Sequence, residues 1–271
     1  MENSNNLYGP SVEAFARLLK IMDELRLKCP WDQKQTLASL RPLTLEEVHE
    51  LSESILENNL DSISAEIGDV LLHLVFYAKI GSELEVFTME GIINKLCEKL
   101  IYRHPHIYGN VIVNNEEDVK KNWEQLKLKA GNSSVLGGVP SSLPSLIKAM
   151  RIQEKAAGVG FDWPNGELVW EKVVEELEEF HTEAKKSKLT QFGTQESSEK
   201  MEDEFGDILF SLINYARFMK INPDNALEKT SMKFIKRFSF IETKAKENSI
   251  ELNSKNSALM ENWWKESKLS I

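Results

Sequence analysis

One ordered set of features occurs twice along this chain of 271 residues, and the duplication constrains the fold more than any other property. Each copy begins with a segment of helical periodicity, continues with an acidic string and a Glu-x-x-Asp pair, and ends with a Lys/Arg pair and a tryptophan. Equivalent residues are 129 positions apart at Glu47 and Glu176 and 141 apart at Trp123 and Trp264, a difference that loop insertions explain. We therefore expect two related domains in tandem.

Glycine and proline are sparse, with 13 and 8 residues, and several of them gather in the segment 131–145. This segment interrupts the helical periodicity, so it predicts a linker between two domains. We expect the N-terminal domain to span residues 1–130 and the C-terminal domain to span residues 146–271.

The apolar residues follow helical rather than strand spacing. They recur every three or four positions over residues 63–78 and again over 208–216, which is typical of amphipathic helices. A polar, turn-forming stretch at 58–62 separates two helical segments and predicts an antiparallel helical hairpin. Strand-like composition is confined to 111–113. The chain is therefore expected to be all-α, as a tandem repeat of two antiparallel helical bundles.

Composition argues against several classes of protein. With 43 acidic against 33 basic residues, the formal net charge of -10 disfavours binding to nucleic acid. The two cysteines, Cys29 and Cys97, do not form a secreted disulfide framework, and residues 1–6 lack the apolar core of a signal peptide. The longest apolar run, residues 70–78, is shorter than the roughly 18 residues that span a bilayer. We expect a cytoplasmic protein that does not bind membranes.

Each copy carries two pairs of acidic residues with helical spacing. In the first copy, Glu47 pairs with Glu50 on one helix face. Glu66 and Asp69 share a face of the next helix, and the hairpin brings both pairs to similar levels. Four carboxylates beside apolar residues repel one another and resist desolvation unless a cation offsets their charge. The predicted metal ligands are Glu47, Glu50, Glu66 and Asp69 in the first copy and Glu176, Glu179, Glu204 and Asp207 in the second.

Oxygen ligands favour a hard divalent cation, Mg²⁺ with Mn²⁺ as an alternative, whereas zinc would prefer His or Cys ligands. A solvated acidic helix face is the alternative interpretation for either copy alone. A di-iron carboxylate bundle would need Glu-x-x-His in both copies. The two strings of that type, Glu46–His49 and Glu178–His181, occur in different registers, which disfavours this class.

Basic residues follow the acidic pairs in both copies. Lys99 and Arg103 lie four residues apart and so share a helix face. Lys233 and Arg237 have the same spacing, and residues 229–246 contain six basic residues against one acidic residue. A metal ion with guanidinium groups nearby suits a polyphosphate ligand. Because the basic stripe lies in the second copy, we expect the C-terminal site to be the more active one.

The ordered motifs resemble a known family. Glu-Glu-x-x-Glu followed by Glu-x-x-Asp occurs together with Cys29–Asp32, Arg103–His106 and Gly160–Trp163. This set is similar to that of the MazG nucleoside triphosphate pyrophosphohydrolases in their two-repeat form. The resemblance implies an all-α fold, homodimerisation and Mg²⁺ dependence. It also implies hydrolysis of ribo- and deoxyribonucleoside triphosphates, ATP among them, to the monophosphate and pyrophosphate.

The resemblance also implies roles for individual residues. The implied nucleotide contacts are Lys233, Arg237 and Trp264 in the second copy, with Lys99, Arg103 and Trp123 as their counterparts in the first. In the mechanism that we expect, one acidic residue, Glu175 or Glu179, accepts a proton from the attacking water. The sequence does not choose between these two residues.

Two other functions are compatible with the sequence. The first is an all-α pyrophosphatase narrowed to a single substrate such as dUTP. The second is a non-catalytic docking module whose acidic residues only solvate the helices. Activity across the nucleotides tests the first alternative, and calorimetry with Mg²⁺ and a non-hydrolysable triphosphate tests the second.

Overall fold

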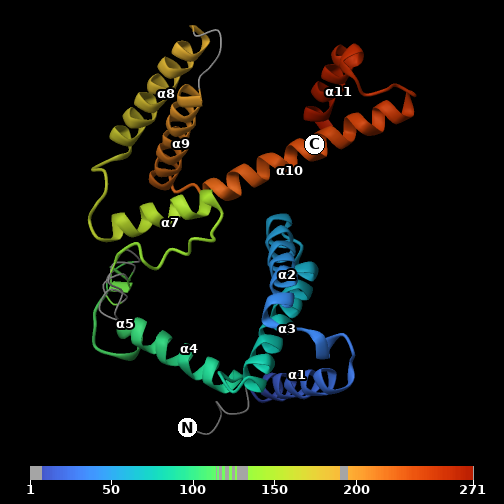
Figure 1. The fold of residues 1–271 in the computed structure, drawn as a ribbon, viewed down its shortest axis with the longest axis vertical. Coiled ribbons are helices and arrows are strands. Elements are labelled where there is room, and N and C mark those ends of the chain that lie inside the picture. The colour runs from blue at the N-terminus through green and yellow to red at the C-terminus, as the bar shows by residue number, and fades with distance from the viewer. Residues whose placement is uncertain are drawn as a thin grey trace. The chain divides into compact units, whose positions relative to one another are not determined.

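The chain is helical and separates into two compact units, Met1–Ile112 and Val113–Ile271. The computed structural model describes residues 8–113, 134–189 and 195–270, together with positions 115, 118, 119, 122, 123 and 126. All regular structure in these residues is helical, and the strand-like segment 111–113 is irregular (Figure 1). The all-α prediction is therefore confirmed.

The division between the units falls before the predicted linker. From residue 134 to residue 144 the described chain consists of turns, bends and irregular backbone, and residues 131–133 lie outside the described part. The linker at 131–145, and with it the boundary of the N-terminal domain at residue 130, stays a prediction. Among the described residues, no helix is both long enough and apolar enough to span a membrane.

The first unit is built around an antiparallel pair of helices, α2 and α3 (Figure 1). Helices α1 and α4 also pack against α3. The elements of this unit are α1 (Gly9–Lys28), the 3-10 helix η1 (Asp32–Lys34), α2 (Leu37–Glu57), α3 (Leu60–Glu83), α4 (Met89–Arg103) and α5 (Pro105–Tyr108).

Local sequence explains where this helical pair begins and turns. The Thr36 side chain accepts a hydrogen bond from the Ser39 amide at the start of α2, and the Ser39 hydroxyl accepts one from the Thr36 amide. At the other end, Asn58 adopts a left-handed conformation with φ of 54°, which ends the helix. Asn59 then caps α3 by accepting a hydrogen bond from the Ser62 amide. The predicted turn at 58–62 is thus a two-residue connection.

The second unit repeats the helical pair as α8 and α9, and α7 packs against α9 (Figure 1). Helices α10 and α11 pack against each other around Ile241, Ala245 and Trp263. The elements of this unit are α7 (Ser145–Gly158), α8 (Gly166–Leu189), α9 (Gln195–Phe218), α10 (Pro223–Glu247), the 3-10 helix η2 (Ser254–Asn256) and α11 (Ser257–Ser270).

The Gly-Phe-Asp-Trp motif has a structural role at the start of the second hairpin. Asp162 accepts two hydrogen bonds from the Arg217 guanidinium, which lies in the last turn of α9. This bidentate pair ties the segment that leads into α8 to the end of α9. In the first unit, Arg26 of α1 donates instead to the backbone oxygens of Asp32 and Gln35.

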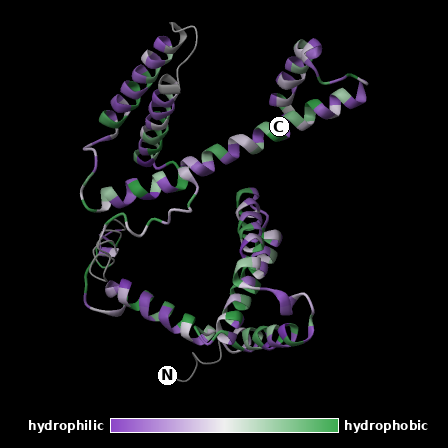
Figure 2. Ribbon diagram, in the orientation of Figure 1, coloured by the Kyte–Doolittle hydropathy of each residue, from purple (hydrophilic) through white to green (hydrophobic). Residues whose placement is uncertain are grey.

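Both hairpins leave the same apolar positions exposed. On α3 these are Ile67, Leu71 and Leu74, with exposed fractions of 53%, 36% and 52%. Their counterparts on α9 are Phe205, Leu209 and Leu212, with exposed fractions of 50%, 46% and 40%. Hydrophobic and hydrophilic residues accordingly mix along these helices (Figure 2). Each hairpin thus presents an apolar stripe that its own unit does not fully cover.

A partly buried polar network joins the two helices of the first hairpin. The Thr44 hydroxyl on α2 lies 3.0 Å from His73 Nδ1 and 2.6 Å from the Tyr77 hydroxyl on α3. Burial lowers the pKa of His73, although the negative charge of Asp69 acts in the opposite direction. The lowered pKa favours a neutral imidazole in the folded protein. The equivalent positions of the second hairpin hold Val173, Ser211 and Tyr215. The network is therefore a feature of the first repeat.

We expect Thr44→Val to lower the free energy of unfolding by about 2 kcal/mol, because the buried His73 and the half-buried Tyr77 would lose a hydrogen-bond partner. Urea denaturation monitored by circular dichroism measures this change. Ser211→Ala is the matched control, since within the described residues the Ser211 hydroxyl donates to the Ile208 carbonyl of its own helix and bridges to no other helix. A Thr44→Val protein as stable as the wild type would show that the network does not stabilise the hairpin.

Candidate carboxylate sites on the two hairpins

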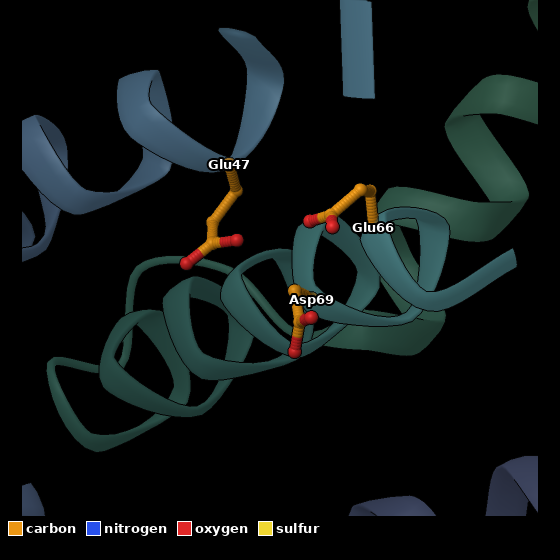
Figure 3. Close-up of side chains that lie close together, drawn as sticks. All are labelled: Glu47, Glu66 and Asp69. Carbon is orange, nitrogen blue, oxygen red and sulfur yellow. The ribbon is translucent and has the colours of Figure 1, made fainter. Parts of the chain in front are cut away.

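The first hairpin gathers three of its predicted ligands. Glu47 extends from α2, while Glu66 and Asp69 extend from successive turns of α3 (Figure 3). Carboxylate oxygens of the three residues lie within 4.8 Å of one another. Glu47 and Glu66 are half-buried and Asp69 is exposed, so a ligand could reach this first cluster from solvent.

The second hairpin repeats the arrangement with equivalent residues. Glu176 extends from α8, and Glu204 and Asp207 extend from α9. Their carboxylate oxygens also lie within 4.8 Å of one another. Glu176 is only 6% exposed, so this second cluster includes a carboxylate that is almost fully buried. A polar side chain in such a position needs a partner of opposite charge.

The fourth predicted ligand of each copy lies outside these three-residue clusters. Glu50 is exposed, but its charge contributes to the environment of Glu47. In the second copy, partial desolvation raises the pKa of Glu179, and the charges of Glu176 and Glu204 raise it further. Ligation by Glu50 and Glu179 stays a prediction.

Electrostatics in the first cluster favours a cation. Desolvation raises the pKa of Glu47, and the negative charges of Asp69, Glu50 and Glu66 raise it further. Across the described residues, no lysine or arginine forms an ion pair with Glu47, Glu66 or Asp69. Uncompensated oxygen donors at this spacing suit a hard divalent cation such as Mg²⁺ or Mn²⁺.

We expect Glu47→Gln to raise the free energy of unfolding of the metal-free protein by about 0.5 kcal/mol at pH 7.5, because it removes like-charge repulsion. With a folded-state pKa above the ordinary 4.5, Glu47 favours folding below pH 4.5, and this contribution is lost as pH rises through the folded-state pKa. The gain from the substitution should therefore vanish below pH 4.5.

In saturating Mn²⁺, Glu47→Gln should instead lower the free energy of unfolding, because Gln is a weaker ligand for the cation than Glu. Thermal and urea unfolding, each carried out in EDTA and in Mn²⁺, measures the change in unfolding free energy under both conditions. Glu57→Gln, at an exposed position of the same helix, is the control and should show no dependence on Mn²⁺. Identical effects of Glu47→Gln with and without Mn²⁺ would argue against cation binding at the first cluster.

Lys172 distinguishes the second cluster from the first, and the sequence analysis missed it. Its ammonium nitrogen lies 2.7 Å from Glu176 Oε1 and 3.0 Å from Glu175 Oε1. Hydrogen bonds to these two carboxylates raise the pKa of Lys172. The signal was present as Lys-x-x-x-Glu, an i,i+4 pair on one helix face. The equivalent position in the first copy holds Leu43.

An acidic hollow adjoins the second cluster on α8 and α9. Its volume is about 420 Å³. The residues that line it are Glu175, Glu178, Glu179, Thr182, Glu183 and Glu204. Both candidate proton acceptors, Glu175 and Glu179, therefore face the same open space beside the second cluster.

The predicted nucleotide contacts of the second copy lie on α10 and α11. The Arg237 guanidinium lies over the ring of Trp264, 5.7 Å from its centroid. Phe234 packs against the same ring at a centroid distance of 5.1 Å. Lys233 is exposed on α10. The structure thus brings Arg237 and Trp264 together, but no described ion pair joins Lys233 or Arg237 to the second cluster.

The first-copy counterparts are more dispersed. Lys99 is exposed and Arg103 is half-buried, both on α4. Trp123 is half-buried, in a stretch where only some residues are described. Within the described contacts, none joins Lys99 or Arg103 to the first cluster. The roles of these residues stay predictions.

Two tandem helical hairpins, each with three carboxylates gathered between its helices, define an all-α repeat protein with two candidate metal sites. Within that class, residues 35–108 and 165–239 each match the MazG nucleotide pyrophosphohydrolase domain, and the chain belongs to this family. The two matched segments contain both hairpins, so the internal duplication is confirmed.

Relatives match almost the whole chain. The nucleoside triphosphate pyrophosphohydrolase/pyrophosphatase MazG of Thermotoga maritima is 40% identical over 259 residues, which cover 94% of this chain and 95% of that protein. The nucleoside triphosphate pyrophosphohydrolase of Escherichia coli K12 is 36% identical, with 93% and 96% covered. Bacillus subtilis YabN is 41% identical over 280 residues, which cover 99% of this chain and 56% of YabN.

Proposed function

We propose that this protein is a Mg²⁺-dependent hydrolase that cleaves nucleoside and deoxynucleoside triphosphates between the α- and β-phosphates, releasing a monophosphate and pyrophosphate. The observation that carries the proposal is the pair of carboxylate clusters, each assembled from two helices of a hairpin. Family membership and the printed activities of the Thermotoga and Escherichia relatives support the same substrate class.

The carboxylates fit a hard divalent cation, because the donors are all oxygen and the first cluster has no basic ion-pair partner among the described residues. Mg²⁺ would bind between the helices, with Mn²⁺ as an alternative. When bound, the cation would supply a water of lowered pKa and offset negative charge on the phosphates. The proposed ligands are Glu47, Glu50, Glu66 and Asp69 in one repeat and Glu176, Glu204 and Asp207 in the other, where Glu179 is assigned to proton transfer rather than ligation.

In the second repeat, the chain's own cations would hold the triphosphate. Lys233 and Arg237 would bind phosphate oxygens and stabilise negative charge on the pyrophosphate leaving group. The half-buried Trp264 ring, which lies beside Arg237, would stack on the base. Lys172, released from Glu176, is an additional candidate for a phosphate contact.

Glu179 is the better candidate for the residue that accepts the proton from water. It faces the acidic hollow and lies outside the three-residue cluster. Its raised pKa makes it a stronger base than an ordinary carboxylate. Glu175 faces the same hollow but is paired with Lys172, which occupies one of its oxygens.

A homodimer is the proposed assembly. The exposed stripe of Ile67, Leu71 and Leu74, and its counterpart on α9, would be covered by helices of a second copy, as in helical bundles. The proposed location is the cytoplasm, where nucleoside triphosphates are available. In this proposal, nucleic acid and membranes are not partners.

A product assay on all eight common nucleotides, with Mg²⁺, with Mn²⁺ and with EDTA, tests the activity. We expect monophosphate and pyrophosphate in equal amounts, and none in EDTA. Hydrolysis in ¹⁸O-labelled water should place the label in the monophosphate, because the proposed attack is at the α-phosphorus. Turnover of dUTP alone would favour the narrow pyrophosphatase instead. Absence of both turnover and analogue binding would favour the docking module.

A further inference from the structure

The two carboxylate clusters differ in one charged neighbour, although their ligand residues are equivalent. In the second cluster, Lys172 lies one helical turn before Glu176 and contacts its carboxylate at 2.7 Å. In the first cluster, the same position relative to Glu47 holds Leu43, which packs against the apolar core of its unit. Among the described residues, the first cluster therefore has no counterpart of the ammonium group that pairs with Glu176 in the second.

Burial makes this lysine the natural partner of Glu176. The Glu176 side chain is 8% exposed, whereas that of Lys172 is 34% exposed. A carboxylate that is almost fully buried depends strongly on its counter-charge. The ammonium group, by contrast, sits close enough to solvent to move away when another partner is offered. Glu175, at 3.0 Å, provides a second carboxylate that can keep part of the contact.

We propose, on the basis of the proposed metal-dependent function, that Lys172 pairs with Glu176 and thereby prevents a divalent ion from binding to the second cluster. When a polyphosphate binds Lys172, Glu176 is released and the ion can bind. A divalent ion and the ammonium group compete for the same buried carboxylate, and their positive charges repel each other. Phosphate oxygens offer the ammonium group a stronger set of acceptors.

The consequence is unequal loading of the two repeats. In the absence of nucleotide, the first cluster binds the divalent ion and the second remains paired with Lys172. The second cluster takes up its ion together with the triphosphate. Such coupling prevents the second cluster from holding an activated water when no substrate is bound.

Mn²⁺ binding to the full chain, measured by electron paramagnetic resonance of free Mn²⁺, tests this proposal without relying on turnover. An Asp69→Asn background isolates the second cluster, and an Asp207→Asn background isolates the first. In the Asp69→Asn background without nucleotide, Lys172→Leu should tighten Mn²⁺ binding by about tenfold. In the Asp207→Asn background, the reciprocal Leu43→Lys should weaken binding by about the same factor.

Lys28→Leu is the matched control, since it removes one positive charge from an exposed i,i+4 ion pair with Glu24. It should leave both Mn²⁺ affinities unchanged. Lys172→Met, at a partly exposed position, provides a second variant should Leu43→Lys fail to fold. Addition of an α,β-methylene nucleoside triphosphate to the Asp69→Asn protein should tighten Mn²⁺ binding when Lys172 is present. The gain in Mn²⁺ affinity should be smaller when Lys172 is replaced.

If Lys172→Leu and Lys172→Met left the Mn²⁺ affinity of the second cluster unchanged, the proposal would be overturned and the proposed function would remain intact. Tight Mn²⁺ binding by that cluster without nucleotide, unaffected by Lys172→Leu, would do the same. Failure of both clusters to bind Mn²⁺, with or without the analogue, would instead contradict the metal-dependent function.

Discussion

Turnover of nucleoside triphosphates should fall by about 10³-fold when Asp207 is replaced by Asn, with a similar loss for Glu204→Gln. Each substitution keeps the shape of the side chain and removes one negative charge from the second cluster. Several kcal/mol of transition-state stabilisation depend on a cation that this cluster would hold. Pyrophosphate release under saturating substrate and Mg²⁺ measures the effect as kcat.

The equivalent substitutions in the first repeat, Asp69→Asn and Glu66→Gln, are the matched controls. We expect a much smaller loss of kcat, because the basic stripe and Lys172 belong to the second unit. Circular dichroism must show that all four proteins fold. If Asp69→Asn were inactive and Asp207→Asn fully active, catalysis would have to be assigned to the first repeat. Equal losses in both would mean that the two clusters act together.

The second large effect is expected at Arg237. Arg237→Ala should lower kcat/KM by about 10²-fold, because it removes both the proposed phosphate-binding cation and the group that lies over Trp264. Arg237→Lys should restore only part of the loss, since an ammonium group lacks the planar fork of a guanidinium. Steady-state kinetics with one ribonucleotide and one deoxyribonucleotide measures kcat and KM separately.

Arg103→Ala is the corresponding control in the first repeat and should have a much smaller effect, in line with the dispersed setting of that residue. Trp264→Leu should raise KM more than it lowers kcat, because stacking binds the base and does not act on the reacting phosphorus. A normal kcat/KM in the Arg237→Ala protein would remove Arg237 from the site.

Much of the fold could be predicted because it depends on local periodicity. The spacing of apolar residues predicted the helices, and the polar stretch at 58–62 predicted the hairpin turn. In the structure, the left-handed Asn58 and the Asn59 cap form this turn. The i,i+3 spacing of acidic residues likewise placed Glu66 and Asp69 on one face. Glu47 joins them because the hairpin turn sets the register of α2 against α3.

Other parts of the site depended on tertiary packing, which periodicity does not report. Many lysines lie four residues from a glutamate, and only the burial of Glu176 makes Lys172 important. In the same way, Thr44 and His73 are 29 positions apart, and the helix pairing alone brings them into contact. Whether Glu50 and Glu179 act as ligands depends on side-chain conformations that helical spacing does not determine.

The two hairpins differ in the length of chain beyond their carboxylates. Glu47 and Glu66 are 19 positions apart, and their helices are joined by a two-residue turn with a left-handed asparagine. Glu176 and Glu204 are 28 positions apart, so the second hairpin has nine more residues between its ligands. Inserted peptides, such as an epitope or a fluorophore-labelling tag, should therefore be tolerated between α8 and α9, whereas the same graft at Asn58 would shift the register of α3 and scatter its acidic residues.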